Sequence, residues 1–256
     1  MPLLLSALLD SRLAPAPDEN RRLRFLTAQP YAHRGLHGGR VIENSRTAFR
    51  DAIAAGHGIE CDVQVSKDGT AFVFHDYALD RLTGAEGKVA DRHDAELDAI
   101  TLRDSDETIP RLAAMLDLVA GRVPVLIEVK AESRRVNALC LSVRRALEGY
   151  RGPAAVMSFN PYVGRWFATN GEHIIRGLVV SEENRKGLRG RAERHMSLWK
   201  AKPDFLAYDI RDLPSTFAES QRQRGLPVLT WTVRTADQEA TAFNAADEII
   251  YERDHS

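Results

Sequence analysis

A regular alternation of short apolar runs with longer amphipathic stretches is the feature that most constrains the fold. The amphipathic stretches, such as 47–55 and 134–147, carry apolar residues at helical spacing. Strands that alternate with helices predict βα units built around a parallel sheet. The strand-like runs lie near residues 31, 60, 126, 155, 177, 206, 230 and 249. Eight parallel strands in 256 residues predict a single (β/α)8 barrel of the TIM type.

One segment departs from this alternation. Residues 63–74 have the pattern of two strands around Asp68-Gly69, a dipeptide typical of tight hairpins. Such a short connection joins only antiparallel strands, so the second strand is expected to lie outside the barrel. A two-residue loop at Asp68-Gly69 would set Asp62 opposite His75.

Residues 1–29 precede the first strand and are expected to form a helical leader packed on the barrel domain, 30–256. The apolar stretch Pro2–Leu9 is much shorter than the roughly 20 residues of a membrane helix. It also lacks the positive region that precedes the core of a signal peptide. Secretion stays open as an alternative, because residues 14–16 (Ala-Pro-Ala) resemble a cleavage site.

Composition narrows the classes of partner. The 35 Lys and Arg residues nearly balance 36 Asp and Glu, for a net charge of −1. This balance argues against a nucleic-acid partner but allows a small anionic substrate, which needs only a few local cations. Cys61 and Cys140 are too few for a disulfide framework, which favours two buried thiols and a cytoplasmic location. The oligomeric state is left open.

Polar residues at the expected strand ends are the candidates for chemistry, because active sites of parallel barrels lie at the carboxyl ends of the strands. Two pairs of charged residues occur at i, i+2 spacing, which places both members on the same side of the sheet. Five charged side chains and two histidines are expected to converge at one mouth: His33, Arg34, Glu60, Asp62, His75, Glu128 and Lys130.

These residue types fit phosphate chemistry at a metal ion. Three crowded carboxylates repel one another unless a cation neutralises them, and an all-oxygen set favours Mg²⁺ or Ca²⁺ over Zn²⁺. Arg34 and Lys130 could hold a phosphate, and two histidines could exchange protons near neutral pH. Each residue taken alone also fits a structural role, such as a salt bridge at a strand edge or a hydrogen-bonded loop histidine.

Ten short segments add a family resemblance in their order and spacing: Ala32–Gly35, Glu43–Phe49, Ile59–Val63, Lys67–Gly69, Phe74–Asp76, Leu79–Gly84, Ile109–Leu112, Leu126–Lys130, Ser158–Asn160 and Thr230–Val233. Together they resemble the glycerophosphodiester phosphodiesterase family from about residue 30 to the C-terminus. The resemblance implies a TIM barrel of the phospholipase-C-like phosphodiesterase type, in agreement with the strand count.

The resemblance also implies a role for each matching position. Metal-binding carboxylates are Glu60, Asp62 and Glu128, and the general acid/base pair is His33 and His75. Phosphate-contacting cations are Arg34 and Lys130. Among the remaining matches, Glu43 is expected to lie beside the metal or to orient a histidine, and Asn44 to hold the same loop. Asp76 is expected to position His75 or its loop. The aromatic residues Phe159 and Trp231 either line the mouth of the barrel or pack in its core.

The expected activity is metal-dependent hydrolysis of glycerophosphodiesters to glycerol 3-phosphate and an alcohol, through a cyclic phosphate. Two alternatives stay open: a lipid-active phosphodiesterase with the same site, acting on lysolipids or phosphatidylglycerol, and a non-catalytic barrel that binds a phosphate ligand. Ser45 stands where the family often has Thr, a change that keeps the hydroxyl. Residues 76–110 leave no room for a large inserted domain.

Overall fold

The computed structural model describes residues 2–17 and 21–253. The helices are α1 (Pro2–Leu13), α2 (Arg46–Ala54), α3 (Asp94–Ala99), α4 (Leu112–Val119), α5 (Asn137–Leu147), α6 (Pro161–Asn170), α7 (Leu188–Ala201), α8 (Thr216–Gln223) and α9 (Ala236–Ala245), with short 3₁₀ segments η1 (Arg21–Thr27), η2 (Val89–Asp91) and η3 (Ile210–Asp212). The strands are β1 (Tyr31–Ala32), β2 (Gly58–Val65), β3 (Ala71–Val73), β4 (Val125–Val129), β5 (Ala154–Ser158), β6 (Ile175–Val180), β7 (Phe205–Asp209), β8 (Val228–Val233) and β9 (Glu248–Tyr251).

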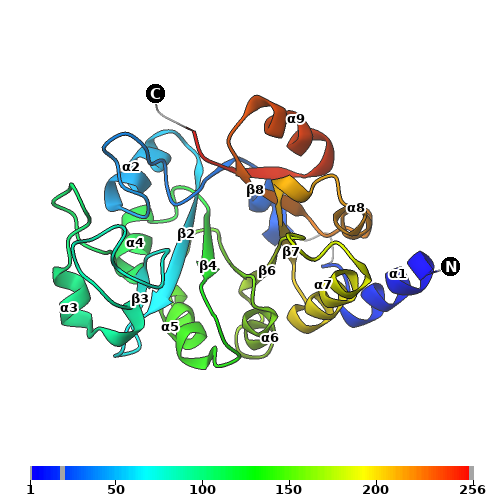
Figure 1. The fold of residues 1–256 in the computed structure, drawn as a ribbon, viewed down its shortest axis with the longest axis horizontal. Helices are drawn as coiled ribbons and strands as arrows, with labels where there is room; N and C mark the ends of the chain where they lie inside the picture. The colour runs from blue at the N-terminus through cyan, green and yellow to red at the C-terminus, as the bar shows by residue number, and fades with distance from the viewer. Residues whose placement is uncertain (1, 18–20, 254–256) are drawn as a thin grey trace. The chain divides into compact units, whose positions relative to one another are not determined.

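Eight parallel strands form a closed (β/α)8 barrel, as the alternation predicts. The strand order is β1-β9-β8-β7-β6-β5-β4-β2-β3, and β1 also pairs with β2. Strand β3 lies outside the ring and is antiparallel to β2 (Figure 1). The predicted fold class is therefore confirmed, with a strand at each of the eight expected positions. The described residues divide into two compact parts, 31–154 with 252–253, and 2–17 and 21–30 with 155–251.

The hairpin between β2 and β3 is present, but its predicted register is wrong by one residue. Val65 pairs with Ala71, and the amide of Ser66 donates to the carbonyl of Thr70 at 2.9 Å. The loop therefore contains three residues, of which the last, Gly69, has φ +89°. Loops of three residues place a glycine in this left-handed conformation, so an Asp-Gly dipeptide fits them as well as it fits a two-residue turn.

The observed register changes the residue opposite Asp62. The amide of Phe74 donates to the carbonyl of Asp62 at 3.0 Å, so these two residues face each other across the hairpin. His75 is one residue further along the chain. It leaves the sheet at this point and lies in the loop that follows β3.

Residues 76–110, which form the excursion after the hairpin, contain the short helix α3 and also enclose apolar side chains. Seven fully or almost fully buried residues form one cluster: Phe72, Phe74, Leu79, Val89, Leu97, Leu102 and Ile109. Because two of these side chains come from β3 and the residue after it, the excursion is packed against the hairpin. The loop that carries His75 is therefore flanked by residues of this buried apolar cluster, Phe74 and Leu79.

In the other part of the chain, α1 packs beside α7 (Figure 1). The contact includes a fully buried carboxylate, Asp10. Its oxygens accept hydrogen bonds from His195 Nδ1 at 2.8 Å, Trp199 Nε1 at 2.7 Å and Gln221 Nε2 at 2.8 Å. A buried carboxylate needs such partners, because desolvation without them costs several kcal/mol, of the order of 3–5.

Across the described ranges, 2–17 and 21–253, we find no helix that combines the length and the apolar character needed to cross a bilayer.

Candidate active site

The site begins at the turn after β1. Arg34 has a left-handed backbone conformation (φ +56°), and Gly35 follows at φ +79°. A side chain at Gly35 would lie 2.8 Å from Cβ of Ala48, so glycine allows this turn to approach α2 closely. In this conformation, the amide of Arg34 donates to Glu60 Oε2 at 3.1 Å.

Three carboxylates from two adjacent strands lie together. Glu60 and Asp62 are on β2, Glu128 is on β4, and Asp62 pairs directly with Glu128 in the parallel register. Oxygens of the three groups lie within 4.8 Å of one another, and all three residues are buried. The expected set of metal-binding carboxylates is thus brought together, and a cluster made only of carboxylate oxygens favours hard cations.

This carboxylate cluster has the properties of a cation site. Glu60 Oε1 is buried and has no hydrogen-bond partner among the described residues. Burial, followed by the charges of Asp62 and Glu128, raises the pKa of Glu60 well above its usual value. Burial also raises the pKa of Glu128 to about 6. A divalent cation would offset this repulsion, so the residues present fit such an ion.

Two basic side chains border the carboxylates. Lys130 Nζ lies 3.0 Å from Glu128 Oε1 and 3.4 Å from Asp62 Oδ1, and Arg34 Nε lies 3.3 Å from Asp62 Oδ2. Burial alone would raise the pKa of Asp62, but the charges of Lys130 and Arg34 outweigh it and lower the pKa. Both cations therefore lie within ion-pair distance of the cluster, in positions from which a phosphate could be held.

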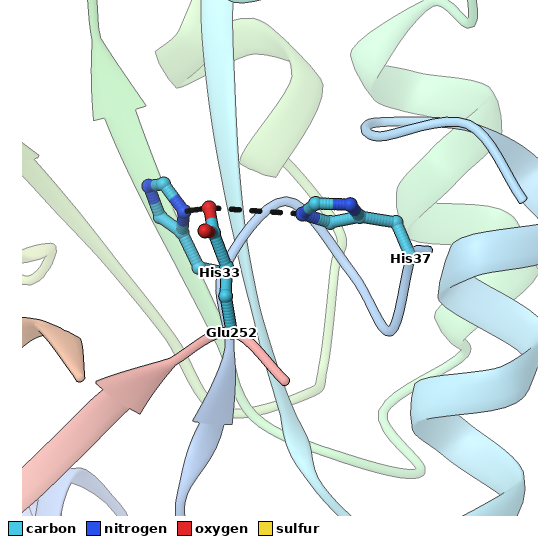
Figure 2. Close-up of side chains that lie close together, drawn as sticks. All are labelled: His33, His37 and Glu252. Carbon is cyan, nitrogen blue, oxygen red and sulfur yellow. Dashed lines mark hydrogen bonds and ion pairs between the residues drawn. The ribbon is translucent and has the colours of Figure 1, made fainter. Parts of the chain in front are cut away.

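His33 lies between two carboxylates, Glu60 and Glu252, of which Figure 2 shows Glu252. Its Nδ1 is 2.5 Å from Glu252 Oε1, and its Nε2 is 3.8 Å from Glu60 Oε2. On the other side of Glu252, His37 Nε2 lies 3.8 Å from the same oxygen. Burial lowers the pKa of His33, despite the hydrogen bond with Glu252 that acts in the opposite direction. The neutral imidazole is thus favoured near pH 7.

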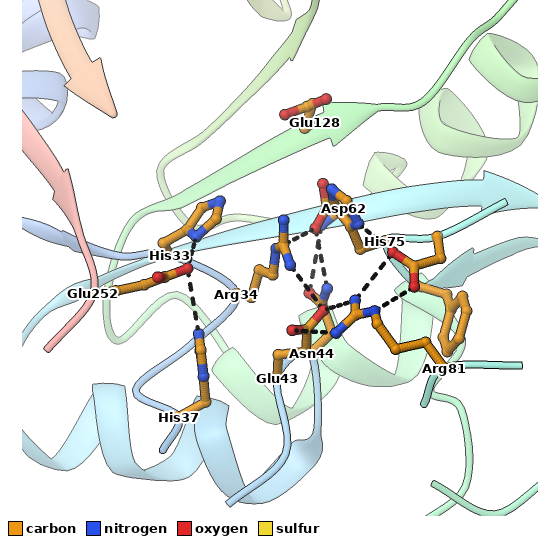
Figure 3. Close-up of polar contacts among 12 residues, drawn as sticks. His33, Arg34, His37, Glu43, Asn44, Asp62, His75, Arg81, Glu128 and Glu252 are labelled. Carbon is orange, nitrogen blue, oxygen red and sulfur yellow. Dashed lines mark hydrogen bonds and ion pairs between the residues drawn. The ribbon is translucent and has the colours of Figure 1, made fainter. Parts of the chain in front are cut away.

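His75 has a carboxylate partner of its own. Its Nδ1 lies 2.6 Å from Asp76 Oδ1 (His75 is labelled in Figure 3). The loop that carries both residues is held by Gln64. Gln64 Nε2 lies 3.1 Å from the carbonyl oxygen of Phe74 and 2.5 Å from that of Asp76. A hydrogen bond from Arg81 is the main cause that lowers the pKa of Asp76 to about 2.

Glu43 and Asn44 hold neighbouring side chains in place. Glu43 Oε1 accepts from Arg34 Nη1 at 2.9 Å. Asn44 has φ +58°, and its Nδ2 donates to Asp62 Oδ2 at 3.1 Å. These contacts orient Arg34 and Asp62.

The two predicted aromatic residues contact each other in the part of the chain that contains β5 and β8. The rings of Phe159 and Trp231 meet edge to face, with centroids 5.4 Å apart. Trp231 Nε1 donates to the carbonyl of Ala207 at 3.0 Å. Phe159 is 47% exposed, so its ring is not in the core and is accessible to a ligand.

Two residues that contact the predicted site residues, Glu252 and Arg81, were not predicted from the sequence. Glu252 directly follows β9, and Arg81 lies in the loop after β3. A signal for Glu252 exists, since it is a carboxylate at the carboxyl end of the last parallel strand, as Glu128 is near the end of β4. Arg81 lies within one of the matching segments, but its spacing alone does not indicate its contacts.

Comparison with known proteins gives one consistent result. Residues 33–250 match the model of the glycerophosphoryl diester phosphodiesterase family. A glycerophosphodiester phosphodiesterase of Caldanaerobacter subterraneus subsp. tengcongensis is 29% identical over 231 residues, which are 86% of this chain and 91% of the relative. A glycerophosphodiester phosphodiesterase of Bacillus altitudinis is 38% identical over 110 residues, which are 40% and 44% of the two chains.

Solved structures of similar fold come from the same family. The glycerophosphodiester phosphodiesterase of Thermotoga maritima has a TM-score of 0.69 at 25% identity, over 86% of this chain and 92% of its own. A phosphodiesterase of Oleispira antarctica, solved with its product sn-glycerol-3-phosphate, has a TM-score of 0.76 at 22% identity, over 88% and 93%. At such identities the second similarity concerns the fold.

Proposed function

The chain belongs to the glycerophosphoryl diester phosphodiesterase family and is a hydrolase of that class, and we propose that it cleaves glycerophosphodiesters to glycerol 3-phosphate and an alcohol. The observation that carries this proposal is the buried cluster of Glu60, Asp62 and Glu128 with Arg34 and Lys130 at its edge. Such a cluster can hold a cation and a phosphate side by side. The product bound to the Oleispira phosphodiesterase supports the choice of substrate class.

We assign Glu60, Asp62 and Glu128 as the residues that hold one divalent cation, Mg²⁺ or Ca²⁺. Carboxylate oxygens suit both ions. When bound, a divalent cation would supply Lewis-acid stabilisation of charge on phosphate oxygens. The buried Glu60 Oε1, which lacks a hydrogen-bond partner within the described chain, supports this assignment.

Arg34 and Lys130 would bind the phosphate of the diester. An arginine can donate two parallel hydrogen bonds to a phosphate, and Glu43 keeps the Arg34 guanidinium in place. Lys130 would contribute a second positive charge. Preorganised charges of this kind stabilise the negative charge that develops in the transition state. Phe159 and Trp231 are proposed to contact the glycerol or the leaving alcohol.

His33 and His75 would transfer the protons. One histidine accepts the proton of the neighbouring glycerol hydroxyl as its oxygen bonds to phosphorus, and the other donates a proton to the alcohol oxygen as its bond to phosphorus breaks. Water then opens the resulting cyclic phosphate and leaves glycerol 3-phosphate. An internal nucleophile reacts with high effective molarity. The carboxylates Glu252 and Asp76 support this role, because each binds the Nδ1 side of one histidine and thereby orients the ring.

A product assay tests the proposal. The purified protein is incubated with Mg²⁺ and glycerophosphocholine, glycerophosphoethanolamine or glycerophosphoglycerol, and glycerol 3-phosphate is measured with an enzyme-coupled assay. Release from at least one of these diesters is expected. If the protein instead releases only choline phosphate or another headgroup phosphate, the proposed bond cleavage is wrong.

A lipid-active phosphodiesterase is the second candidate. Leu8 and Leu13 of α1 are 69% and 39% exposed, although both are apolar. Exposed leucines on one helix could contact a micelle or bilayer. Activity on lysophosphatidylcholine in detergent that exceeds activity on glycerophosphocholine would favour this candidate, and the reverse order would exclude it as the main activity.

We also propose a cytoplasmic location. Cys61 and Cys140 are both buried free thiols, as is usual in a reducing compartment. Cell fractionation that finds the protein in the periplasm or medium would contradict this location.

A further inference from the structure

Arg81 lies between two carboxylates of the site (Figure 3). Its Nε is 2.5 Å from Asp76 Oδ2 and its Nη2 is 3.0 Å from Asp76 Oδ1. The same guanidinium also contacts Glu43, with Nη2 at 2.7 Å from Oε1 and Nη1 at 3.1 Å from Oε2. One side chain therefore binds both oxygens of both carboxylates.

Each of these carboxylates has a second partner that the proposed reaction uses. Asp76 Oδ1 is 2.6 Å from His75 Nδ1, and Glu43 Oε1 is 2.9 Å from Arg34 Nη1. The contacts thus form one chain in the order His75, Asp76, Arg81, Glu43, Arg34. It links a proton-transfer group to a phosphate-binding group through a residue that has neither role.

The geometry requires an arginine. The guanidinium presents five donors in a fixed plane, and four donor contacts to two carboxylates use that plane. A lysine has one nitrogen at this position and cannot bind both carboxylates in the same way. Arg81 is also 48% exposed, and ion pairs of exposed side chains contribute little to stability. Its effect is therefore expected on the orientation of its partners.

We infer that Arg81 is a positioning residue that holds Asp76 and Glu43, and through them His75 and Arg34, in a single arrangement. This inference rests on the proposed function for the roles of His75 and Arg34. It assigns to Arg81 a contribution to turnover without contact to the substrate.

Steady-state kinetics of Arg81→Ala and Arg81→Lys test the inference. Loss of a residue that orients active-site groups typically costs 10- to 100-fold, so a fall of about that size is expected in kcat/KM, with part of it in kcat. Arg81→Lys is expected to restore less than a tenth of the lost activity. A value within about twofold of the wild type for either variant would overturn the inference.

A matched control is Arg103→Ala. Arg103 is exposed and donates to the carbonyl oxygens of Asp80 and Thr83, so it supports the same loop without contacting a carboxylate of the site. Its kcat/KM is expected to stay within about twofold of the wild type. An equal loss in Arg103→Ala would assign the effect to the loop and contradict the positioning role.

A combined variant shows whether Arg81 acts through its two partners. Arg81→Ala introduced into the Asp76→Asn, Glu43→Gln double variant is expected to change kcat/KM by less than about twofold, because the groups it positions are already released. A further tenfold loss would mean that Arg81 acts by another route.

A measurement without substrate separates the inference from the proposed function. Nitrogen-15 NMR at pH 7 reports which ring nitrogen of His75 carries the proton, with His75→Gln used for assignment. In the wild type the proton is expected on Nδ1, toward Asp76, and in Arg81→Ala a mixture of tautomers is expected. Unchanged His75 signals would overturn the inference. A wild type that cleaves no glycerophosphodiester while the signals change would instead overturn the proposed function alone.

Discussion

At the scale of single residues, the site is defined by buried carboxylates that face one another. Glu60, Asp62 and Glu128 converge from two strands, and Arg34 and Lys130 lie within ion-pair distance of this cluster. The raised pKa of Glu60 is the physical consequence of its burial and then of this crowding. A cation is the group that such an arrangement accommodates best.

Replacement of Glu60 tests this interpretation. Glu60→Gln keeps the shape of the side chain and removes its charge, so Mg²⁺ affinity and activity are both expected to fall by about 10²-fold or more. Calorimetric Mg²⁺ titration and the product assay measure the two effects. Because a repelled buried charge is removed, the free energy of unfolding without metal is expected to stay equal or to rise. Undiminished Mg²⁺ binding would exclude Glu60 as a ligand.

Replacement of either histidine tests the proton transfer. His33→Ala and His75→Ala are each expected to lower kcat by about 10²- to 10⁴-fold, the usual contribution of a general acid or base. Circular dichroism should show an unchanged fold. Near-normal turnover in one of them would remove that histidine from the mechanism.

Most of the candidate site could be predicted from residues at strand ends, because parallel strands bring their carboxyl ends to one face. Glu60, Asp62 and Glu128 illustrate this, since their spacing and strand positions alone imply that they meet. Glu252 directly follows β9 and carries the same strand-end signal, but its contacts with His33 and His37 do not follow from that position. Arg81 could not be found in this way, because its contacts depend on where the loop after β3 folds back, which no local spacing encodes.

At the scale of elements, the pattern of apolar residues does not determine which residues of two strands face each other, and close packing between strands restricts the side chains further. The β2–β3 hairpin shows this limit of the sequence pattern, since Asp-Gly fits both a two-residue and a three-residue loop, and the two loops differ by one residue in strand register.

Close packing between two strands is most evident at Gly177. Gly177 on β6 pairs with Phe205 on β7, and a Cβ at Gly177 would lie 2.4 Å from the Phe205 ring.

The substitution Gly177→Ala is therefore expected to destabilise the protein by about 1–3 kcal/mol, as overpacking of a core does. Urea unfolding measures the change. Gly84→Ala is the control, because a Cβ there meets no atom within 4 Å, and a change below about 0.5 kcal/mol is expected. Equal stability of the two variants would contradict the packing argument.

The helix α1 is expected to depend on Asp10 for its attachment. Asp10→Asn should lower the free energy of unfolding at pH 7 by about 1–3 kcal/mol, because charge-assisted hydrogen bonds to a buried group are weakened. Burial raises the pKa of Asp10, but the hydrogen bonds of His195, Gln221 and Trp199 outweigh it, so the pKa lies below its usual 3.8.

The pH dependence of this effect has a definite sign. A lowered pKa in the folded state stabilises the protein above pH 3.8, and this contribution is lost as the pH falls through the folded-state pKa. The difference in urea stability between wild type and Asp10→Asn should therefore shrink from pH 7 to pH 3. A constant difference would show that the carboxylate charge is not what holds α1.

At the scale of the whole molecule, the barrel could be predicted because the spacing of apolar residues differs between strands and helices and because the connections between them are short. The net charge of −1 does not indicate the site, because three carboxylates and two basic side chains that lie together nearly cancel in the total. The placement of the residues around that arrangement depends on the closed ring of strands. The sequence pattern indicates such a ring but not its side-chain contacts.

The most direct test of the central claim is the release of glycerol 3-phosphate from glycerophosphocholine before and after removal of divalent ions. We predict release in the presence of Mg²⁺ or Ca²⁺, loss of activity to below about one hundredth after treatment with a chelator and dialysis, and recovery when either ion is added back. Activity that is undiminished in the chelated protein would contradict the account.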